Sequence, residues 1–306
     1  MLTMALLGGA LMKGWAQVPG TCGELAQGIL GKQALHITCP IDCWVSAEVS
    51  LEPGQGNIDG LQDRSKTRRA LEKLLDQWQL RNHYDVQINL HNPLPKGKGM
   101  ASSTADLCAT LYALAQACQR TLTTQELSNL ILAIEPSDGL FLPGISIFDH
   151  RSGSKAETIT SKIPAIDLLI YDMGGEVDTV IFNSQEELIE LNIAKVGQVQ
   201  QAFDLLVSGL QSGERKKIGQ GATISALANQ NILPKVNLEI IAEETTALGA
   251  LGVAIAHSGT TLGILVEREQ REKQEKLWQW MNEQSQAYTY LGHYRLVGGG
   301  PRYQQS

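Results

Sequence analysis

One loop of this sequence combines glycines, lysines and hydroxyl side chains at a spacing that could bind phosphate. Residues 93–104 follow an alternating apolar stretch and precede apolar residues at helical spacing, so the loop joins a strand to a helix. Free N–H groups at a helix start attract anions, and glycine lets a phosphate approach the backbone. Hydroxyl groups there can also bind the Mg²⁺ of a nucleotide. The candidate nucleotide-binding residues are Pro95, Lys96, Gly97, Lys98, Gly99, Met100, Ala101, Ser102, Ser103 and Thr104.

The loop by itself leaves two interpretations open. It is either a phosphate cradle or an ordinary helix start after a tight turn, with Ser102, Ser103 and Thr104 as helix caps. It is not a Walker A loop, because Gly97 and Lys98 are followed by Gly99 and no glycine lies five residues before Gly97. Any phosphate site here must therefore be of another kind.

Two acidic residues follow a short apolar helix that Pro136 must end, since proline lacks the N–H group and disfavours helix in the residue before it. Glu135 and Asp138 therefore lie at a helix exit. Two acids at this spacing could serve as a cation ligand and a proton acceptor. They could equally form a solvated turn in which Asp138 binds its own backbone, and the residues alone favour the turn.

Two other glycine-rich segments carry polar side chains. Residues 19–28 are predicted to form a turn, in which Glu24 and Gln27 either bind the ammonium and carboxylate of an amino acid or are simply polar surface. Residues 256–263 lie where a strand meets a glycine loop. His257 there is either a hydrogen-bonded structural residue or a ligand contact. The candidate substrate-binding residues of the two segments are Thr21, Cys22, Gly23, Glu24, Gln27, Ser258, Gly259 and Thr260.

Apolar periodicity predicts the elements that position these segments. Strands are expected over residues 43–49 and 84–90, with a helix over 70–78 between them. After a polar connection at 152–162, helices are expected over 184–210, 217–230 and 236–250, strands over 252–257 and 262–266, then a helix to about 283 and a last strand. This pattern predicts an α/β chain of α+β type with two domains, residues 1–160 and 161–306.

Composition narrows the class of protein. With 306 residues, 43% of them hydrophobic, and a net charge of −7, the chain should be compact and lacks the basic excess that would draw nucleic acid or an anionic membrane. Five scattered cysteines argue against a disulfide framework and favour a reducing cytoplasm. Cys39 and Cys43 are interpreted as packed thiols rather than a zinc site. The apolar first twelve residues lack the flanking signals of a secretory peptide.

The three glycine-rich segments together resemble the motifs of the GHMP kinases (galacto-, homoserine, mevalonate and phosphomevalonate kinases). That family's second motif, a proline and then Gly-x-Gly-Leu-Gly-Ser-Ser-Ala, is similar to residues 97–105, with Met100 and Ala101 in place of Leu and Gly. Residues 19–28 are similar to the first, substrate-side motif, and residues 256–263 to the third, which closes over the nucleotide. Within the family, the first and third segments look most like the branch that phosphorylates L-threonine in adenosylcobalamin biosynthesis, with support from residues 135–139, 172–179 and 222–226.

The resemblance implies an N-terminal mixed-sheet domain that carries the ATP loop and a C-terminal ferredoxin-like α+β domain. It implies ATP and L-threonine as substrates and O-phospho-L-threonine as the product, with Mg²⁺ held by Ser103 and Glu135 and Asp138 as the catalytic base. Asp172, Asp178 and Thr179 either face the substrate or form a turn. The alternatives are a kinase for homoserine or another small alcohol, and a non-catalytic nucleotide or amino-acid sensor. Ser103, Glu135 and Asp138 together argue against a sensor, which needs neither metal ligand nor base.

Overall fold

The chain folds into an 11-stranded mixed sheet that is covered by helices, in a computed structural model that describes residues 11–175, 188–284 and 288–304. The strands are β1 (Met12–Leu30), β2 (Gln33–Pro53), β3 (Ile58–Asp59), β4 (Tyr84–His91), β5 (Ile145–Asp149), β6 (Ala156–Thr160), β7 (Ile166–Asp172), β8 (Gly252–Ile255), β9 (Thr261–Glu267), β10 (Thr289–Arg295) and β11 (Arg302–Tyr303). The helices are α1 (Ser65–Gln77), α2 (Ser102–Ala117), α3 (Thr124–Leu132), α5 (Leu188–Ala194), α6 (Val196–Ser212), α7 (Arg215–Ala228), α8 (Leu238–Ala247) and α9 (Arg271–Glu283).

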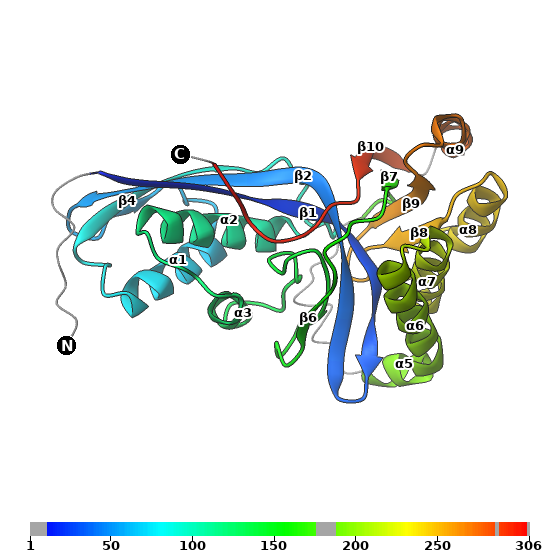
Figure 1. The fold of residues 1–306 in the computed structure, drawn as a ribbon, viewed down its shortest axis with the longest axis horizontal. Helices are drawn as coiled ribbons and strands as arrows, with labels where there is room; N and C mark the ends of the chain where they lie inside the picture. Colours follow the sequence, from blue (N-terminus) through cyan, green and yellow to red (C-terminus); the bar gives the residue numbers. More distant parts are fainter. Residues whose placement is uncertain (1–10, 176–187, 285–287, 305–306) are drawn as a thin grey trace.

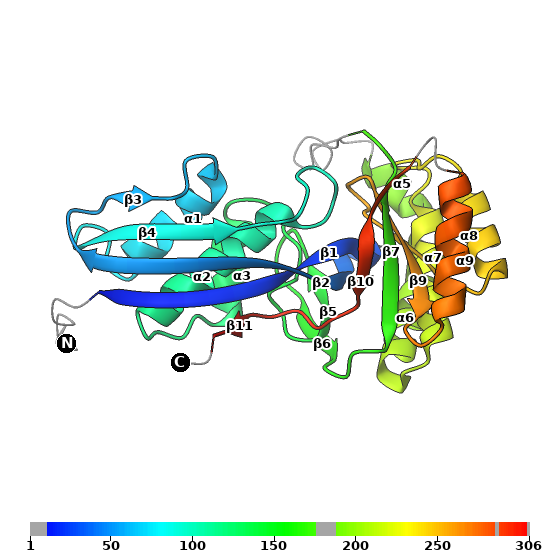
Figure 2. The same ribbon diagram turned by 90° about the horizontal axis from the view of Figure 1, so that it is seen from above.

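The two longest strands connect the two ends of the molecule. The sheet order is β10-β7-β9-β8-β1-β2-β4-β3, so β1 and β2 lie in its middle. Figure 1 shows both strands running from the end that carries α1, α2 and α3 and bending toward the end that carries α5 to α8. Figure 2 shows the same arrangement from above, with β11 returning along β1. Segments far apart in sequence therefore meet around β1.

Helix burial follows from residue pattern. In α1 the buried residues Ala70, Leu71, Leu74 and Leu75 recur at the helical spacing that predicts this helix, and α1 packs against α2 and α3. Helix α2 is apolar on nearly all sides and is buried along most of its length, as expected of a helix enclosed by other elements. A main apolar core joins residues of α1, α2 and the long strands to residues of α6 and α7. The start of α2 is thus held in place by a continuous packed interior.

The expected strands and helices are largely confirmed, with three differences. The polar connection expected at 152–162 contains strand β6, which pairs with β5. Residues 19–28 do not form a turn: they continue strand β1, and shifts in the pairing with β2 at Pro19/Gly20, Thr21/Glu24 and Glu24/Ala26 accommodate them. The helix expected over 184–210 is divided, since Lys195 separates α5 from α6. Residues 184–187 of that expectation, and Asp178 and Thr179, lie outside the described residues.

Two further observations bear on composition. The five cysteines are free thiols, four of them buried and Cys43 partly so. No helix in the described ranges has the length and apolar character that crossing a membrane requires.

The sheet is continuous across residue 160, because β1 pairs with both β2 and β8. The two-domain division at that residue stays a prediction.

Candidate active site

The three glycine-rich segments meet around one cavity of about 150 Å³. Two backbone N–H groups of β1 donate to the loop between β4 and α2. The N–H of Thr21 donates to Met100 O (3.2 Å) and that of Gly23 to Gly99 O (3.2 Å). On the other side, the N–H of Thr260 donates to Lys98 O over 3.0 Å. The loop after β4 is therefore tied by its backbone to both neighbouring segments.

Gly99 and Gly259 let two of these segments touch. A Cβ atom on Gly99 would lie 2.2 Å from the Cβ of Ala256, and one on Gly259 would lie 2.5 Å from the Cα of Gly99. Real Cβ atoms do not approach other atoms so closely. Glycine at both positions is thus required by close packing of the backbone, and Gly99 also has a positive φ of 84°.

Helix α2 begins at the cavity with unsatisfied N–H groups. Its N-cap is Ala101, in the left-handed region (φ 59°, ψ 28°), and no side chain caps the helix. The prediction that Ser102, Ser103 and Thr104 act as caps is therefore wrong, because they lie inside the first turn and their hydroxyls bond elsewhere. Ser102 Oγ accepts from Asn92 Nδ2, and Thr104 Oγ1 pairs with Ser137 Oγ at 2.9 Å. The free N–H groups are available to an anion.

Glu135 lies directly opposite this helix start. Helix α3 ends at Leu132, so the expected exit ahead of Pro136 is confirmed, and Glu135 is only 8% exposed. The hydroxyl of Ser103 donates to Glu135 Oε1 over 2.5 Å, and the ammonium of Lys66 pairs with Glu135 Oε2. One hydroxyl and one carboxylate oxygen thus lie together beside the α2 N-terminus. Oxygen ligands of this kind fit Mg²⁺.

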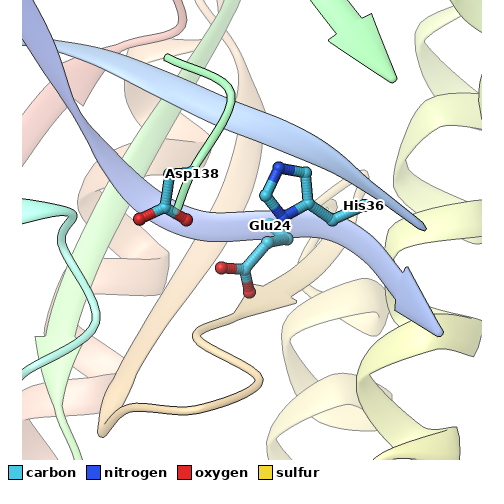
Figure 3. A group of neighbouring side chains, drawn as sticks. All are labelled: Glu24, His36 and Asp138. Carbon is cyan, nitrogen blue, oxygen red and sulfur yellow. The ribbon is translucent and has the colours of Figure 1, made fainter. Parts of the chain in front are cut away.

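Glu24 and Asp138 form a second acidic group in the same cavity. Figure 3 shows Glu24 on β1, His36 on β2 and Asp138 on the loop after α3, and an oxygen or nitrogen atom from each lies within 4.8 Å of the others. Glu24 Oε2 accepts from the backbone N–H of His257 and lies 3.0 Å from its ring Nδ1. Asp138 shares a hydrogen bond with Glu24. The two carboxyl groups are therefore close enough to share a proton.

The electrostatics place that proton on Asp138. Burial, together with the charge of Glu24, raises the pKa of Asp138 well above its usual range. Burial also raises the pKa of Glu24, to about 7, while the N–H of His257 favours its charged form. The histidines stay neutral, because burial lowers the pKa values of His36 and His257 well below their ordinary range. His36 Nε2 already accepts the N–H of Gly139 over 3.1 Å, so it holds the Asp138 loop rather than offering a lone pair to a metal.

The lining of the cavity contains about two thirds of the expected site residues. Its lining includes these candidates: Glu24, Gln27, Pro95, Gly97, Gly99, Met100, Ala101, Ser102, Ser103, Thr104, Glu135, Asp138 and Ser258. The side chain of Lys96 lines an adjoining cavity of about 280 Å³, which shares Lys66, Gly97, Ser102 and Ser103 with the first.

The other candidates lie outside this lining. Lys98 forms an ion pair with Asp172 at 2.9 Å, and Thr260 Oγ1 donates to the same carboxylate over 2.6 Å. Cys22 is buried under Gly263. Three candidates remain. Thr21 is buried, Gly23 packs closely against the backbone of Ala256, and Gly259 packs closely against the backbone of Gly99. These residues do not line the cavity; their contacts hold together the segments that do.

Sequence reasoning missed four side chains of the cavity: Lys66, His36, Ser137 and His150. Lys66 stands in the first turn of a helix, where a lysine ordinarily faces solvent, so nothing local marks it. His36 and His150 stack on each other, with ring centroids 5.3 Å apart, although 114 positions separate them in the sequence numbering. Pairings of this kind depend on tertiary packing.

Comparison with known proteins identifies the family. The family described as GHMP kinases N terminal domain matches residues 65–142. An L-threonine kinase of Salmonella typhimurium is 31% identical over 260 residues, which cover 84% of this chain and 84% of the relative. An L-threonine kinase of Citrobacter freundii is 30% identical over 289 residues, or 93% of this chain and 98% of the relative. The chain belongs to the GHMP kinases. This kinase is accordingly a phosphotransferase with an alcohol group as acceptor.

Solved structures confirm the expected architecture of the kinase. A homoserine kinase from Cytophaga hutchinsonii superposes with a TM-score of 0.73 at 17% identity, covering 99% of this chain and 100% of that chain. A structure described as MDDEF in complex with MVAPP, AMPPCP and magnesium has a TM-score of 0.66 at 14% identity, covering 97% of this chain and 100% of that chain. At such identities the likeness concerns the fold alone.

Proposed function

We propose that this kinase transfers the γ-phosphoryl group of ATP to the side-chain hydroxyl of L-threonine. The observation that carries the proposal is the pair of the buried Glu24 and the half-buried Asp138, which lies in the same cavity as Ser103 and Glu135 at the N-terminus of α2. An acidic pair suits an ammonium group, and a helix N-terminus suits phosphate. The two similar L-threonine kinases support the choice of amino acid.

The size and charge of the cavity favour a small amino acid. About 150 Å³ leaves room for a compact substrate, and the acidic groups Glu24, Asp138 and Glu135 outnumber the single ammonium of Lys66. The adjoining cavity, lined by Arg64, Lys66 and Lys96, would take the rest of the nucleotide. The phosphates would lie between them, at the first turn of α2, where backbone N–H groups and Lys66 supply positive charge.

Ser103 and Glu135 are the residues that would hold Mg²⁺, since their oxygens meet at the phosphate end of the cavity. Bound there, the ion would neutralise charge on the phosphates. Lys66 keeps Glu135 oriented toward Ser103 in the present arrangement. Gly97 and Gly99, both with positive φ, carry no side chain that would keep the phosphates away from the N–H groups.

Asp138 is the proposed base, and the substrate itself would prepare it. In the free protein Asp138 holds a proton, because Glu24 beside it carries the charge. An ammonium group placed between the two carboxyl groups favours the ionised form of both and lowers the pKa of Asp138. The carboxylate then accepts the proton of the substrate hydroxyl while that oxygen bonds to the γ-phosphorus and ADP leaves.

Substrate preference tests the proposal directly. Purified protein is incubated with ATP, Mg²⁺ and, in separate reactions, L-threonine, L-serine and L-homoserine, and kcat/KM is measured for each. We expect L-threonine to be preferred, though modestly over serine, since one methyl group in an apolar pocket is worth only about 1–3 kcal/mol. A higher kcat/KM for homoserine or serine overturns the threonine assignment. ATP binding without ADP formation from any hydroxyl substrate would instead indicate a sensor.

We further propose that the product, O-phospho-L-threonine, supplies the aminopropanol linker of cobalamin, and that the enzyme works in the cytoplasm. A strain that lacks the gene should then need added O-phospho-L-threonine for growth that depends on cobalamin synthesis. Growth of that strain without any supplement, under conditions that require newly made cobalamin, would contradict this placement.

A further inference from the structure

A second, smaller cavity adjoins the active site on the side away from the nucleotide loop. It measures about 20 Å³ and shares Gln27 and His150 with the active-site cavity, while His257, whose N–H donates to Glu24, lines the second cavity alone. Its walls come from the β1–β2 hairpin, α5, the start of α6 and the end of α7. Figure 1 shows α5 beside the far end of that hairpin. The volume suffices for one water-sized group.

The polar wall of this second cavity is positively charged. Lys195 lines it and is only 5% exposed, yet its ammonium donates to a neutral partner, Asn229 Oδ1, at 3.0 Å. No carboxylate among the described residues forms an ion pair with Lys195, and burial alone lowers its pKa to about 8. Arg151, an exposed residue, also lines this cavity. A buried cation without a counter-ion is costly unless an anion joins it.

A helix terminus adds to this positive field. Lys195 is the N-cap residue of the 17-residue helix α6, whose first turn has no capping side chain and no acidic residue. No side chain caps the first N–H groups of α6, and the positive end of the helix dipole lies beside Lys195. The helix start, Lys195 and Arg151 all favour an anion at one place.

One hydrogen-bonded network links this cationic wall to the acidic pair. Lys195 bonds to Asn229, and Asn229 Nδ2 donates to the backbone oxygen of His257 over 3.1 Å. The N–H of His257 donates in turn to Glu24 Oε2. The same network therefore fixes two groups. The Glu24 carboxyl group suits the ammonium of a ligand, and the Lys195 ammonium suits a ligand's carboxylate. This arrangement complements a zwitterion.

We propose that the second cavity binds the α-carboxylate of the amino-acid substrate, with Lys195 as its ion partner. The proposal rests on the proposed function and adds to it a specificity device: only acceptors with a carboxylate next to the ammonium would be bound well. Gln27, whose side chain has no hydrogen-bond partner in the described parts of the chain, borders both cavities and can donate its amide to the carboxylate.

The test compares L-threonine with L-threoninamide, which has a neutral amide in place of the carboxylate. Wild-type enzyme should favour threonine by about 100-fold or more in kcat/KM. Lys195→Met should lower kcat/KM for threonine about 100-fold, mainly through KM, while changing that for threoninamide less than about threefold. Lys195→Arg, which keeps the charge, should recover part of the loss. An equal loss on both substrates, or no loss on threonine, overturns the carboxylate site.

Lys235→Met is the matched control. Lys235 is also 5% exposed with its pKa lowered to about 8 by burial, but it donates to the Ala256 carbonyl and does not line the second cavity. Its substitution should affect threonine and threoninamide alike. Thermal unfolding of each variant checks that the fold is kept. If Lys235→Met reproduces the selective loss, the effect reflects general charge near Glu24 and the assignment to Lys195 is overturned.

Binding measured without turnover separates this proposal from the proposed function. Calorimetric titration of wild type and Lys195→Met with L-threonine and with L-homoserine reports the carboxylate contact whichever amino acid is phosphorylated. Selective loss of affinity in the variant, together with faster turnover of homoserine, would support the second cavity and reject the threonine assignment. Threonine turnover with no change in affinity on Lys195→Met would reject the second cavity alone.

Discussion

At the scale of single residues, the cavity concentrates acidic groups whose protonation depends on one another. Asp138 and Glu24 share a hydrogen bond, and the donors on His257 decide which of them carries the charge. Such a pair titrates as a unit, so the bound substrate changes both groups together. The chemistry of the site thus depends on a few contacts that are remote in sequence.

Asp138→Asn should lower kcat at least about 100-fold with little change in ATP affinity, because a positioned base contributes about 10²–10⁴-fold. Steady-state kinetics and nucleotide titration measure the two quantities. Asp85→Asn is a control far from the cavity: Asp85 accepts N–H groups of residues 55–57 and should alter stability without altering kcat. A fall in kcat of under about tenfold on Asp138→Asn would make Asp138 a positioning residue.

Glu24→Gln should make the protein more stable at pH 8 than wild type. Because burial raises the pKa of Glu24 to about 7 in the folded state, its stabilising contribution is full below about pH 4.5 and is lost as pH rises through 7. The neutral amide avoids that loss, on the order of 3 kcal/mol, and can still accept from His257. Urea denaturation at pH 5 and pH 8 should show the gain growing with pH.

Glu126→Gln provides a control of opposite sign for this pH dependence. Hydrogen bonds from Thr123 lower the pKa of Glu126 in the capping box of α3, so its ionised form stabilises the fold. Its substitution should therefore reduce stability at pH 8. A gain for Glu24→Gln that does not depend on pH would contradict the explanation by ionisation.

At the scale of elements, the site is assembled through backbone atoms. Strand β1, the loop after β4 and the β8–β9 connection are joined by main-chain hydrogen bonds, and the side chains at the contacts are small. The nucleotide loop therefore owes its position to its neighbours as much as to its own sequence. Changes that separate the three segments should affect nucleotide binding even where no ligand is touched.

Gly99→Ala should destabilise the protein by about 3 kcal/mol or more and weaken ATP binding, because its Cβ would overlap Ala256. Gly174→Ala is the matched control: Gly174 also has a positive φ, 87°, but a Cβ there meets nothing within 4 Å. It should cost only the backbone strain, about 1–2 kcal/mol. Urea denaturation compares the two variants. Equal effects would show that strain, and not close packing, explains the glycine at position 99.

Ala101→Gly should raise stability by up to about 1 kcal/mol. Ala101 adopts a left-handed conformation, which costs an alanine about 1–2 kcal/mol and a glycine little, and the greater freedom of unfolded glycine offsets part of the gain. Ala133→Gly, at a right-handed position with φ −72°, should instead lower stability. Chemical denaturation of both variants measures the difference, and a loss on Ala101→Gly would contradict the assigned conformation.

How far sequence predicts this site depends on how local each feature is. The strand, loop and helix around Gly97, and the helix end before Pro136, follow from nearest-neighbour rules and are confirmed. Three closely spaced glycines predict a turn over residues 19–28. Bulges in the pairing with β2 instead let strand β1 continue through these residues. The contact of Lys66 with Glu135 and the burial of Lys195 depend on elements that pack from elsewhere in the chain, and no local pattern marks either residue.

At the scale of the whole molecule, one apolar core runs through both ends of the kinase. Its members include residues of β1, β2 and α2 together with Val199, Phe203 and Leu206 of α6. Strands β1 and β2 carry this core from one end to the other. The proposed division at residue 160 therefore separates parts that share strands.

Thermal unfolding should consequently occur in a single transition for the whole chain. Differential scanning calorimetry should give a calorimetric enthalpy equal to the van't Hoff enthalpy, as expected of one cooperative unit. Intrinsic fluorescence comes from Trp15, Trp44 and Trp78 before residue 160 and from Trp278 and Trp280 after it, and should change at the same temperature. Two resolved transitions would indicate that the halves on either side of residue 160 unfold independently.

The central place of β1 also has a consequence for synthesis. Glu24 leaves the ribosome early, but the N–H group that holds its carboxylate belongs to His257, 233 residues later. The β-strand that pairs with Glu24 through Ile255 emerges equally late, and β11, which pairs with Ala16, emerges later still. Until then β1 has an open edge that can pair with other chains. Nascent chains that stall before residue 257 should lack the active site and depend on chaperones to stay unaggregated.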